Sequence, residues 1–296
     1  MSGRRVVLGT RGSLLAVEQA RPVAAHLEAK GWEVDWRRFT THGDRWLEGP
    51  LDSHRGAGFF TRELEEALQH GALDLVVHSL KDVALERPEG LVTSCIPRRE
   101  DPLDWLLMRA DAPTHPRIGT GAVRRQQLLC RTLPEATFTW IRGNVPTRLQ
   151  HLRAGELRGE PLHGTLLAAA GLRRLGLDLS DLCVRRLAPE ELLPAPGQGA
   201  LLAECRAGHA ALLEALSDLH HEATGRCVAL ERAVLAGLGG GCQQPLGAFA
   251  EALPEGRFRL RAAFAGPSGI VDAEGMGSEA EALATVTGAF RAAGLP

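Results

Sequence analysis

The 296-residue sequence lacks the features of several specialised protein classes. It contains no run of about eighteen apolar residues, so no membrane-spanning helix is expected. The N-terminal residues lead directly into a strand-like Val-Val-Leu run without a signal-peptide pattern, which favours a cytoplasmic protein. The six cysteines form no C-x-x-C pair and have no histidines at the spacing of a zinc site. We therefore expect reduced thiols and no metal site.

Two residue types are scarce. Tyrosine is absent, which removes phenolic hydroxyl groups from any candidate site, and only Lys30 and Lys81 are lysines. The other 32 basic residues are arginines, whose planar fork binds carboxylates and phosphates, although an arginine bias also follows genome composition. Residues 117–186 hold twelve arginines and five acidic residues, whereas the whole chain has a net charge of −2. The middle of the chain is therefore predicted to bind an anion.

Strands and helices alternate from the N-terminus, which predicts an α/β architecture. A strand at 5–8 leads through a Gly/Ser turn with Arg11 and Ser13 into a helix over 14–30. Main-chain N–H groups at such a helix start can face an anion. The alternative is that Ser13 only caps the helix and that Arg11 is a solvated charge.

A second candidate site follows a buried strand predicted at 73–78. Lys81 and Asp82 come directly after this strand, where open α/β sheets place their ligands. The alternative for this pair is a surface ion pair.

Three later strands, predicted at 118–121, 137–141 and 165–169, each deliver arginines near a helix start. Carboxyl ends of neighbouring parallel strands meet at one edge of a sheet, so these side chains are expected to converge on one crevice. They are Arg124, Arg125, Arg142, Arg148, Arg173 and Arg174.

The C-terminal part is organised around a cysteine in a glycine-rich loop. Residues 192–199 are predicted to form a rigid linker, 200–205 a buried strand that returns to the first domain, and 209–238 a helix. Thr61 is predicted to cap a different, earlier helix that starts directly after it. Three glycines then precede Cys242, and glycines let a backbone approach a ligand closely. A cysteine held this way can carry a group covalently; a flexible turn with an incidental cysteine is the alternative.

The predicted fold class is α/β, with two doubly wound periplasmic-binding-protein-like lobes and a small α+β C-terminal domain. Residues 1–98 and 194–214 are assigned to domain 1, and residues 99–193 to the Arg-rich domain 2. Residues 215–296 are assigned to domain 3, which holds the Cys242 loop, an antiparallel sheet between 246 and 273, and a final helix over 279–293.

These motifs together resemble porphobilinogen deaminase, also called hydroxymethylbilane synthase. The matching stretches keep the family's order over about residues 4–250: Gly9-Thr10-Arg11, Thr41-His42-Gly43-Asp44, Val77-His78-Ser79-Leu80-Lys81-Asp82, Arg124-Arg125-Gln126, Arg142-Gly143-Asn144-Val145, Pro196-Gly197-Gln198-Gly199-Ala200, Glu231-Arg232-Ala233 and Gly240-Gly241-Cys242-Gln243.

The resemblance implies a transferase of porphyrin and heme biosynthesis that links four porphobilinogen molecules head to tail, loses ammonia each time and releases hydroxymethylbilane by hydrolysis. It implies a dipyrromethane cofactor held by Cys242 through a thioether, no metal, no nucleic-acid or membrane partner, and a cytoplasmic monomer. Bound tetrapyrrole is strongly anionic, in agreement with the arginine-rich region.

The resemblance also implies residue roles. Asp82 is the expected catalytic carboxylate. The cofactor-binding residues would be Cys242, Lys81, Asp82, Ser79, Thr120, Arg124, Arg125, Arg148, Gly171 and Gln198. The substrate-binding residues would be Arg11, Ser13, Gln19, Phe60, Arg142, Arg148 and Arg174.

The sequence departs from the family pattern in two places. Gly121 and Ala122 stand where hydroxyl residues are usual, so two contacts to the cofactor are lost. Ala57 replaces a common lysine in the loop expected at 50–59 to cover the site, with Arg55 as a nearby substitute.

Two other classes of protein share some of these features. A two-lobed periplasmic binding protein would have the same lobes, but it would carry a signal peptide and need no cysteine on a glycine loop. A nucleic-acid binder would be arginine-rich, but here the arginines come singly or in pairs at turns, without interleaved aromatic residues.

Overall fold

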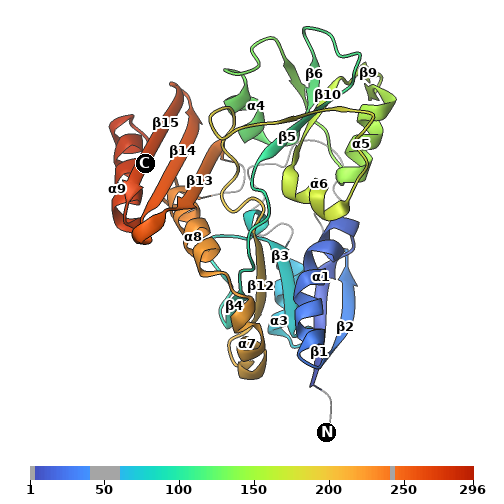
Figure 1. Ribbon diagram of the computed structural model, residues 1–296, viewed down its shortest axis with the longest axis vertical. Helices are drawn as coiled ribbons and strands as arrows, with labels where there is room; N and C mark the ends of the chain where they lie inside the picture. Colours follow the sequence, from blue (N-terminus) through green and yellow to red (C-terminus); the bar gives the residue numbers. More distant parts are fainter. Residues whose placement is uncertain (1–3, 41–60, 241–243) are drawn as a thin grey trace.

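The computed structural model describes residues 4–40, 61–240 and 244–296. Figure 1 shows a lower lobe, an upper lobe and a smaller unit beside them that carries the C-terminus. The two lobes and the C-terminal unit confirm the predicted α/β class. In this described part of the chain, no helix is both long enough and apolar enough to cross a membrane.

The lower lobe comprises β1 (Arg4–Arg11), α1 (Leu14–Ala29), β2 (Trp32–Phe39), α3 (Arg62–Gln69), β3 (Leu75–Ser79), the 3-10 turn η1 (Leu80–Asp82), β4 (Leu91–Cys95), β12 (Leu201–Arg206), α7 (Ala210–Leu216) and the 3-10 turn η2 (Ser217–Leu219). Its sheet has the order β2-β1-β3-β12-β4. β1, β2 and β3 are parallel, whereas β12 runs antiparallel to β3 and β4. Ala20, Val23 and Leu27 recur at helical spacing on α1 and bury its apolar face in the core of this lobe.

The upper lobe comprises β5 (Asp104–Met108), β6 (Arg117–Gly119), α4 (Val123–Leu129), β7 (Thr137–Thr139), α5 (Val145–Ala154), the short strands β8 (Glu156–Leu157) and β9 (Glu160–Pro161), β10 (Gly164–Ala168), α6 (Ala169–Leu175) and β11 (Cys183–Arg186). Its sheet has the order β11-β5-β10-β6-β7. β10, β6 and β7 are parallel, and β5 runs antiparallel to both neighbours. Helices α6, α4 and α5 therefore all start at one edge of the sheet.

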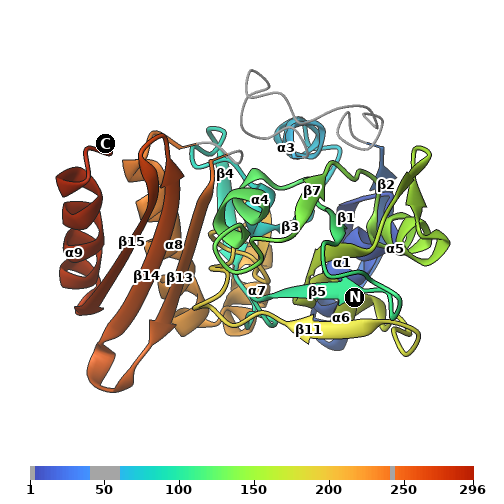
Figure 2. The same ribbon diagram turned by 90° about the horizontal axis from the view of Figure 1, so that it is seen from above.

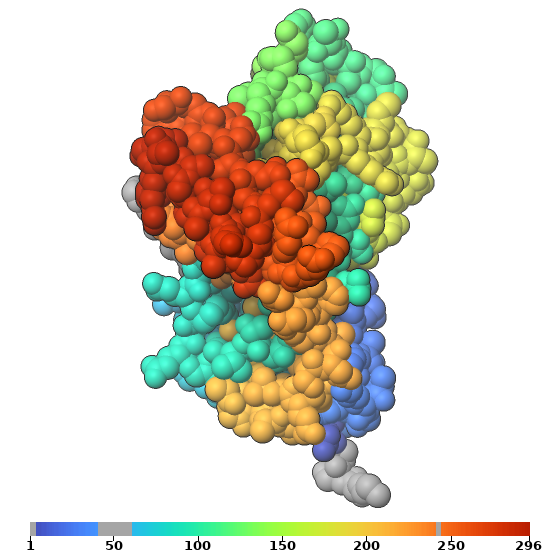
Figure 3. All heavy atoms as spheres, turned by 60° about the vertical axis from the view of Figure 1, so that its left-hand side comes forward, coloured from blue at the N-terminus to red at the C-terminus, as the bar shows by residue number. Residues whose placement is uncertain are grey.

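The C-terminal unit comprises α8 (Glu222–Gly237), β13 (Leu246–Ala252), the 3-10 turn η3 (Pro254–Gly256), β14 (Phe258–Gly266), β15 (Gly269–Gly277) and α9 (Glu279–Ala292). Its three strands form the antiparallel sheet β13-β14-β15, and they run side by side in Figure 2. Apolar residues of α8 and α9 share one core with this sheet, including Val234 and Phe290. Ala263 of β14 joins Leu128 and Leu193 of the upper lobe in another core, and Figure 3 shows this unit against both lobes.

The chain crosses between the lobes twice, and the two crossings touch. Glu100 N donates to Gly199 O at 3.3 Å. Gly199 has φ +86, and a Cβ there would lie 2.5 Å from the Glu100 carbonyl oxygen, so glycine is required by both conformation and space. The crossings therefore form a compact junction between the lobes.

Several local predictions were wrong in detail. The predicted helix over 209–238 is interrupted, because Ile96 N donates to His220 Nδ1 and His221 N donates to Ile96 O, which pulls the chain out of the helix. Thr61 occupies the N-cap of α3 without making a side-chain cap hydrogen bond. The turn at 41–44 and the loop at 50–59 lie outside the described residues.

Candidate active site

Two sheet edges bring the candidate residues together. In the upper lobe, α4 and α5 begin where β6 and β7 end. β5 runs the other way, so its first residue, Asp104, pairs with Ala168 at the end of β10 and lies at that same edge. In the lower lobe, β3 ends at Ser79, which pairs with Leu201 at the start of β12. Lys81 and Asp82 follow β3 directly.

A chain of hydrogen bonds connects these two edges. Lys81 Nζ donates to Gln198 Oε1 at 3.3 Å, and Gln198 Nε2 donates to Asp104 Oδ1 at 3.0 Å. Gln198 also donates to the Pro102 carbonyl at 2.7 Å. Gln198 and Asp104 are 1% and 0% exposed, so this connection is shielded from water. The lower-lobe lysine and the upper-lobe carboxylate are therefore held in one network.

Arg124 and Arg125 are both bound to Asp104. Arg124 Nη2 donates to Asp104 Oδ2 at 2.7 Å, and Arg125 Nη2 donates to Asp104 Oδ1 at 2.6 Å. Other N–H groups of the two arginines donate to the carbonyls of Leu193 and Leu166. Burial by itself would raise the pKa of Asp104, but the charges and hydrogen bonds of the two guanidinium groups hold that pKa well below its usual range. One carboxylate thus accompanies two buried cations, which leaves the group net positive.

Further cations lie next to this group. Burial, together with the positive charges of Arg125 and Arg142, lowers the pKa of Arg148 to about 10. Arg148 Nε donates to the Gly143 carbonyl at 2.8 Å, and no carboxylate of the described residues pairs with it. Burial also lowers the pKa of Arg142. A part-buried cation such as Arg148, which its cationic neighbours repel and which no described carboxylate neutralises, is the electrostatic counterpart of an anionic ligand.

Lys81 belongs to the same cationic environment. Its pKa is lowered to about 8, chiefly by burial and further by the charges of Arg125 and Arg124, against the opposing effects of Asp82 and Asp104. The charged ammonium of Lys81 is therefore disfavoured in this environment. A ligand that supplied carboxylates would stabilise it.

Asp82 differs from the other acid of the site. It is the last residue of η1 and is partly buried. Among the described residues, no donor forms a hydrogen bond or an ion pair with its carboxylate, so the surface ion pair with Lys81 considered above is not formed. Asp82 is therefore an ionisable acceptor whose oxygen atoms are available to a ligand with N–H donors.

The remaining predicted residues occupy varied positions. Ser13 Oγ accepts a hydrogen bond from Ala16 N at 3.2 Å, so it caps α1. Thr120 is fully buried and its hydroxyl accepts from Ala122 N. Arg174 Nη2 donates to the Gly199 carbonyl at 2.8 Å, beside the junction of the crossings. The others are Arg11 at the end of β1, Gln19 on α1, Ser79 at the end of β3 and Gly171 on α6.

Two departures from the family pattern have structural consequences. Ala122 is the N-cap of α4 and supplies no side-chain cap hydrogen bond. A Cβ at Gly121 would lie 3.0 Å from the Ile141 carbonyl oxygen, so this turn has little room for a larger residue without a shift.

Cys242 and Phe60 lie outside the described residues. Gly240 is the last described residue before the cysteine. A Cβ built there would lie 3.2 Å from Leu85 Cδ1, so Gly240 lies against the segment that follows Asp82. The described end of the glycine loop and the Asp82 turn are therefore neighbours.

One buried cluster in the lower lobe has the composition of a metal site. Glu65, His78 and Glu204 place possible ligand atoms within 4.8 Å of one another. Arg87, however, forms ion pairs with both glutamates. The arginine already supplies the positive charge that a cation would bring, so we interpret this cluster as an internal ion-pair network.

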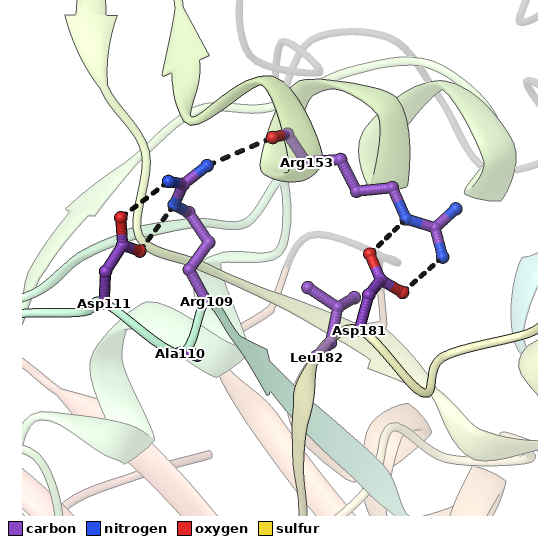
Figure 4. Close-up of a pocket in the computed structure, with 6 residues that line it drawn as sticks. All are labelled: Arg109, Ala110, Asp111, Arg153, Asp181 and Leu182. Atoms are coloured by element: carbon purple, nitrogen blue, oxygen red, sulfur yellow. Dashed lines mark hydrogen bonds and ion pairs between the residues drawn. The ribbon is translucent and has the colours of Figure 1, made fainter.

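The pocket in Figure 4 is lined by residues at the opposite edge of the upper sheet, including Arg109 and Arg153. Arg109 makes two hydrogen bonds to Asp111, and Arg153 makes two to Asp181. These arginines are neutralised by aspartates, unlike Arg148. The pocket therefore has no counterpart of Arg148, which lies in the site between the lobes without a described carboxylate partner.

Sequence reasoning missed Asp104, the central acceptor of the site. The only local signal was a carboxylate at the start of the apolar run Trp105-Leu106-Leu107. Nothing local shows that β5 runs antiparallel to β10, and this direction is what brings Asp104 to the arginines.

Two protein-family models match most of this chain. A family model described as "Porphobilinogen deaminase, dipyromethane cofactor binding domain" matches residues 6–214, and one described as "Porphobilinogen deaminase, C-terminal domain" matches residues 225–288.

Several curated relatives have the same name. The porphobilinogen deaminase of Shouchella clausii is 38% identical over 97% of this chain and 95% of its own length. That of Chromobacterium violaceum is 41% identical over 92% of each chain. Among solved structures, the methionine-binding protein MetQ has a TM-score of 0.45 and 12% identity, covering 78% of this chain and 94% of its own.

Proposed function

The chain belongs to the porphobilinogen deaminase family, and from this membership we propose specific roles for the residues between its two lobes. The activity is that of porphobilinogen deaminase (EC 2.5.1.61), a transferase of tetrapyrrole biosynthesis that uses a dipyrromethane cofactor. It joins porphobilinogen units head to tail with loss of ammonia and releases the linear tetrapyrrole by hydrolysis.

The gathering of Lys81, Arg124, Arg125 and Arg148 around the single carboxylate of Asp104 is the observation that carries the residue assignment. Dipyrromethane bears carboxylate side chains and pyrrole N–H donors, and when bound it supplies the primer on which the chain grows. The depressed pKa values of Lys81 and Arg148 fit the carboxylates, and the Asp82 carboxylate fits the N–H donors. The residues present therefore fit this group.

We assign cofactor binding to Lys81, Arg124 and Arg125, with Gln198 and Asp104 holding them in position. Ser79, Thr120 and Gly171 complete this proposed set, and Cys242 is proposed as the thioether attachment. Arg11, Ser13, Gln19, Phe60, Arg142 and Arg174 are assigned to substrate, and Arg148 to both. Hydrogen bonds of Ser13 and Arg174 within the protein mean that they would approach substrate through their remaining polar atoms.

Asp82 is the proposed catalytic residue. Loss of ammonia from porphobilinogen leaves an electron-poor, azafulvene-like cation, and a preorganised carboxylate stabilises such a charge as it develops. Asp82 has two acceptor oxygen atoms to which no described residue donates. The same carboxylate can therefore accept hydrogen bonds from pyrrole N–H groups and stabilise the developing positive charge.

The test is Asp82→Asn in protein that already carries its cofactor, verified by intact mass. Asparagine keeps the shape but loses the charge and one acceptor, so single-turnover ammonia release should slow by about 10² to 10³. Asp82→Glu keeps the charge on a longer arm and should retain part of the rate. Release by Asp82→Asn within about threefold of the unmodified enzyme would reassign Asp82 to a structural role.

We also propose the three domains as 1–98 with 194–214, 99–193 and 215–296. The return of β12 to the lower sheet supports the split first domain. Monomeric state and a cytoplasmic location stay predictions from the sequence and the family.

A further inference from the structure

Arg232 lies on α8 and reaches across to the turn that carries Asp82. Its Nη1 donates to the carbonyls of Leu80 and Val83 at 3.3 and 3.0 Å, and its Nη2 donates to the carbonyl of Ala84 at 2.6 Å. These carbonyls lie on both sides of Asp82 in the chain. One guanidinium group therefore holds the main chain before and after the proposed catalytic carboxylate.

The turn has few restraints of its own. η1 is a single 3-10 turn, closed by the hydrogen bond from Val83 N to Leu80 O, and no strand follows until β4 begins at Leu91. Leu80 N donates to Ala200 O at 3.0 Å and Lys81 Nζ donates to Gln198, but neither bond holds the main chain after Asp82. An isolated turn of this length is weakly held by its own main chain. The position of Asp82 thus depends on contacts made from outside the turn.

α8 supplies several of these contacts along one face. Val228 is one helical turn before Arg232, so both side chains lie on the same side of α8. Leu80 and Val228 are each 1% exposed and share one apolar cluster. The side chain of Leu80 therefore packs on α8 while its carbonyl accepts from the same helix.

The same helix leads into the cysteine loop. α8 ends at Gly237, and Gly240 lies against Leu85, just beyond the Ala84 carbonyl that Arg232 binds. The Asp82 turn thus meets α8 at Val228 and Arg232 and meets the following loop at Gly240. A shift of the turn relative to α8 would therefore change the position of Asp82 relative to Gly240.

We propose that Arg232 is a positioning residue that holds the Asp82 turn in place against α8. The proposal rests on the assigned role of Asp82. Without its three hydrogen bonds, the turn would sample positions in which the carboxylate is misplaced, and a displacement of about 1 Å can cost about 10² in rate. A residue that only stabilised the fold would leave the chemistry of folded, loaded enzyme unchanged.

The test compares Arg232→Met, which keeps the apolar stem but removes every donor, with Arg232→Lys, which keeps the charge but cannot bridge three carbonyls. Arg226→Met is the matched control, because Arg226 lies on the same helix and pairs with Glu279 at the surface. Measured quantities are intact mass, amide hydrogen exchange of residues 80–85, thermal midpoint and single-turnover ammonia release by the cofactor-loaded fraction.

We expect faster exchange over 80–85 in both Arg232 variants and single-turnover rates lowered by about 10- to 100-fold in molecules of full holo mass. Arg226→Met should change neither. Unchanged exchange at 80–85 would overturn the proposal, and so would faster exchange with a rate within about threefold of the unmodified enzyme. If neither Arg232 variant folds, the residue is structural and the proposal fails.

The assigned role of Asp82 is tested separately. If Asp82→Asn keeps its rate while Arg232→Met loosens the turn, the catalytic assignment fails and the mechanical coupling of turn and helix stands. If Asp82→Asn is slow and Arg232→Met is unaffected in exchange and rate, the catalytic assignment stands and the positioning role fails.

Discussion

Lys81 has a pKa of about 8 because it is buried close to Arg124 and Arg125. In the unfolded chain the same group has its ordinary value of about 10.4. The folded protein therefore bears the cost of the charged ammonium below about pH 8, and this cost disappears as the pH rises toward the ordinary value. Cofactor carboxylates favour the charged form, so they should raise the pKa of Lys81 again.

This predicts a pH-dependent reactivity. In Cys242→Ser protein, which should lack the cofactor, labelling of Lys81 by an amine-reactive reagent should rise through about pH 8. In loaded enzyme the rise should move to higher pH. Peptide mass spectrometry separates the label on Lys81 from that on Lys30, the only other lysine. Labelling of Lys30 serves as the internal control for the pH dependence of the reagent itself. The same Lys81 profile in both proteins would contradict a carboxylate contact.

At the scale of secondary-structure elements, the direction of β5 decides how the arginines are held. Its antiparallel course brings Asp104 to the starts of the helices that follow β6 and β10. Arg124 and Arg125, on α4, bind this carboxylate, whereas Arg148, on α5, has no carboxylate among its described partners. The two helices therefore bring to the same edge one pair of arginines that a carboxylate neutralises and one arginine that no described carboxylate neutralises.

This difference predicts that the two sets of arginines act at different steps, one in cofactor loading and the other in chain elongation. Arg124→Leu or Arg125→Leu should cost on the order of 2 to 5 kcal/mol of charge-pair binding and yield largely apo protein. Arg142→Leu and Arg148→Leu should still load the cofactor, because Lys81, Arg124 and Arg125 continue to bind its carboxylates, but they should stall at or before early elongation. Intact mass measures loading, with Cys242→Ser as the unloaded reference and the other five cysteines dispensable. Equal cofactor loading in all four arginine variants would contradict this assignment of separate steps.

At the scale of the whole molecule, Glu231 joins the C-terminal unit to the junction of the lobes. This fully buried carboxylate on α8 accepts from Arg99 Nη1 and Nη2 at 2.6 and 3.0 Å. It also accepts from Gly197 N at 2.7 Å and Ala250 N at 3.0 Å. Both crossings between the lobes and the strand β13 therefore meet at one side chain.

Removal of this carboxylate should be costly. Glu231→Ala leaves the Arg99 charge buried without its partner, so we expect a loss of about 3 to 5 kcal/mol in the free energy of unfolding. Glu274→Ala is the matched control, because Glu274 makes a similar two-bond pair with Arg259 at the surface. That change should cost no more than about 1 kcal/mol. Denaturant unfolding of both variants measures the difference, and similar losses would contradict a central role for Glu231.

Local sequence patterns determined the α/β alternation and the arrival of Lys81, Asp82 and the arginines at strand ends, because helix and strand periodicities and turn residues act over a few positions. The family motifs added the activity and the cofactor. Residues 41–60 and 241–243, which include Cys242, lie outside the structural description.

Only the tertiary structure determined which residues, far apart in the sequence, form hydrogen bonds with one another at the site. Arg232 binds carbonyls about 150 residues earlier in the chain, and Gln198 meets an aspartate 94 residues before it. Such contacts depend on strand direction and on how the lobes pack, and these follow from the burial of many side chains at once. No local pattern records them, which is why Asp104 and the role of Arg232 became visible only in the folded chain.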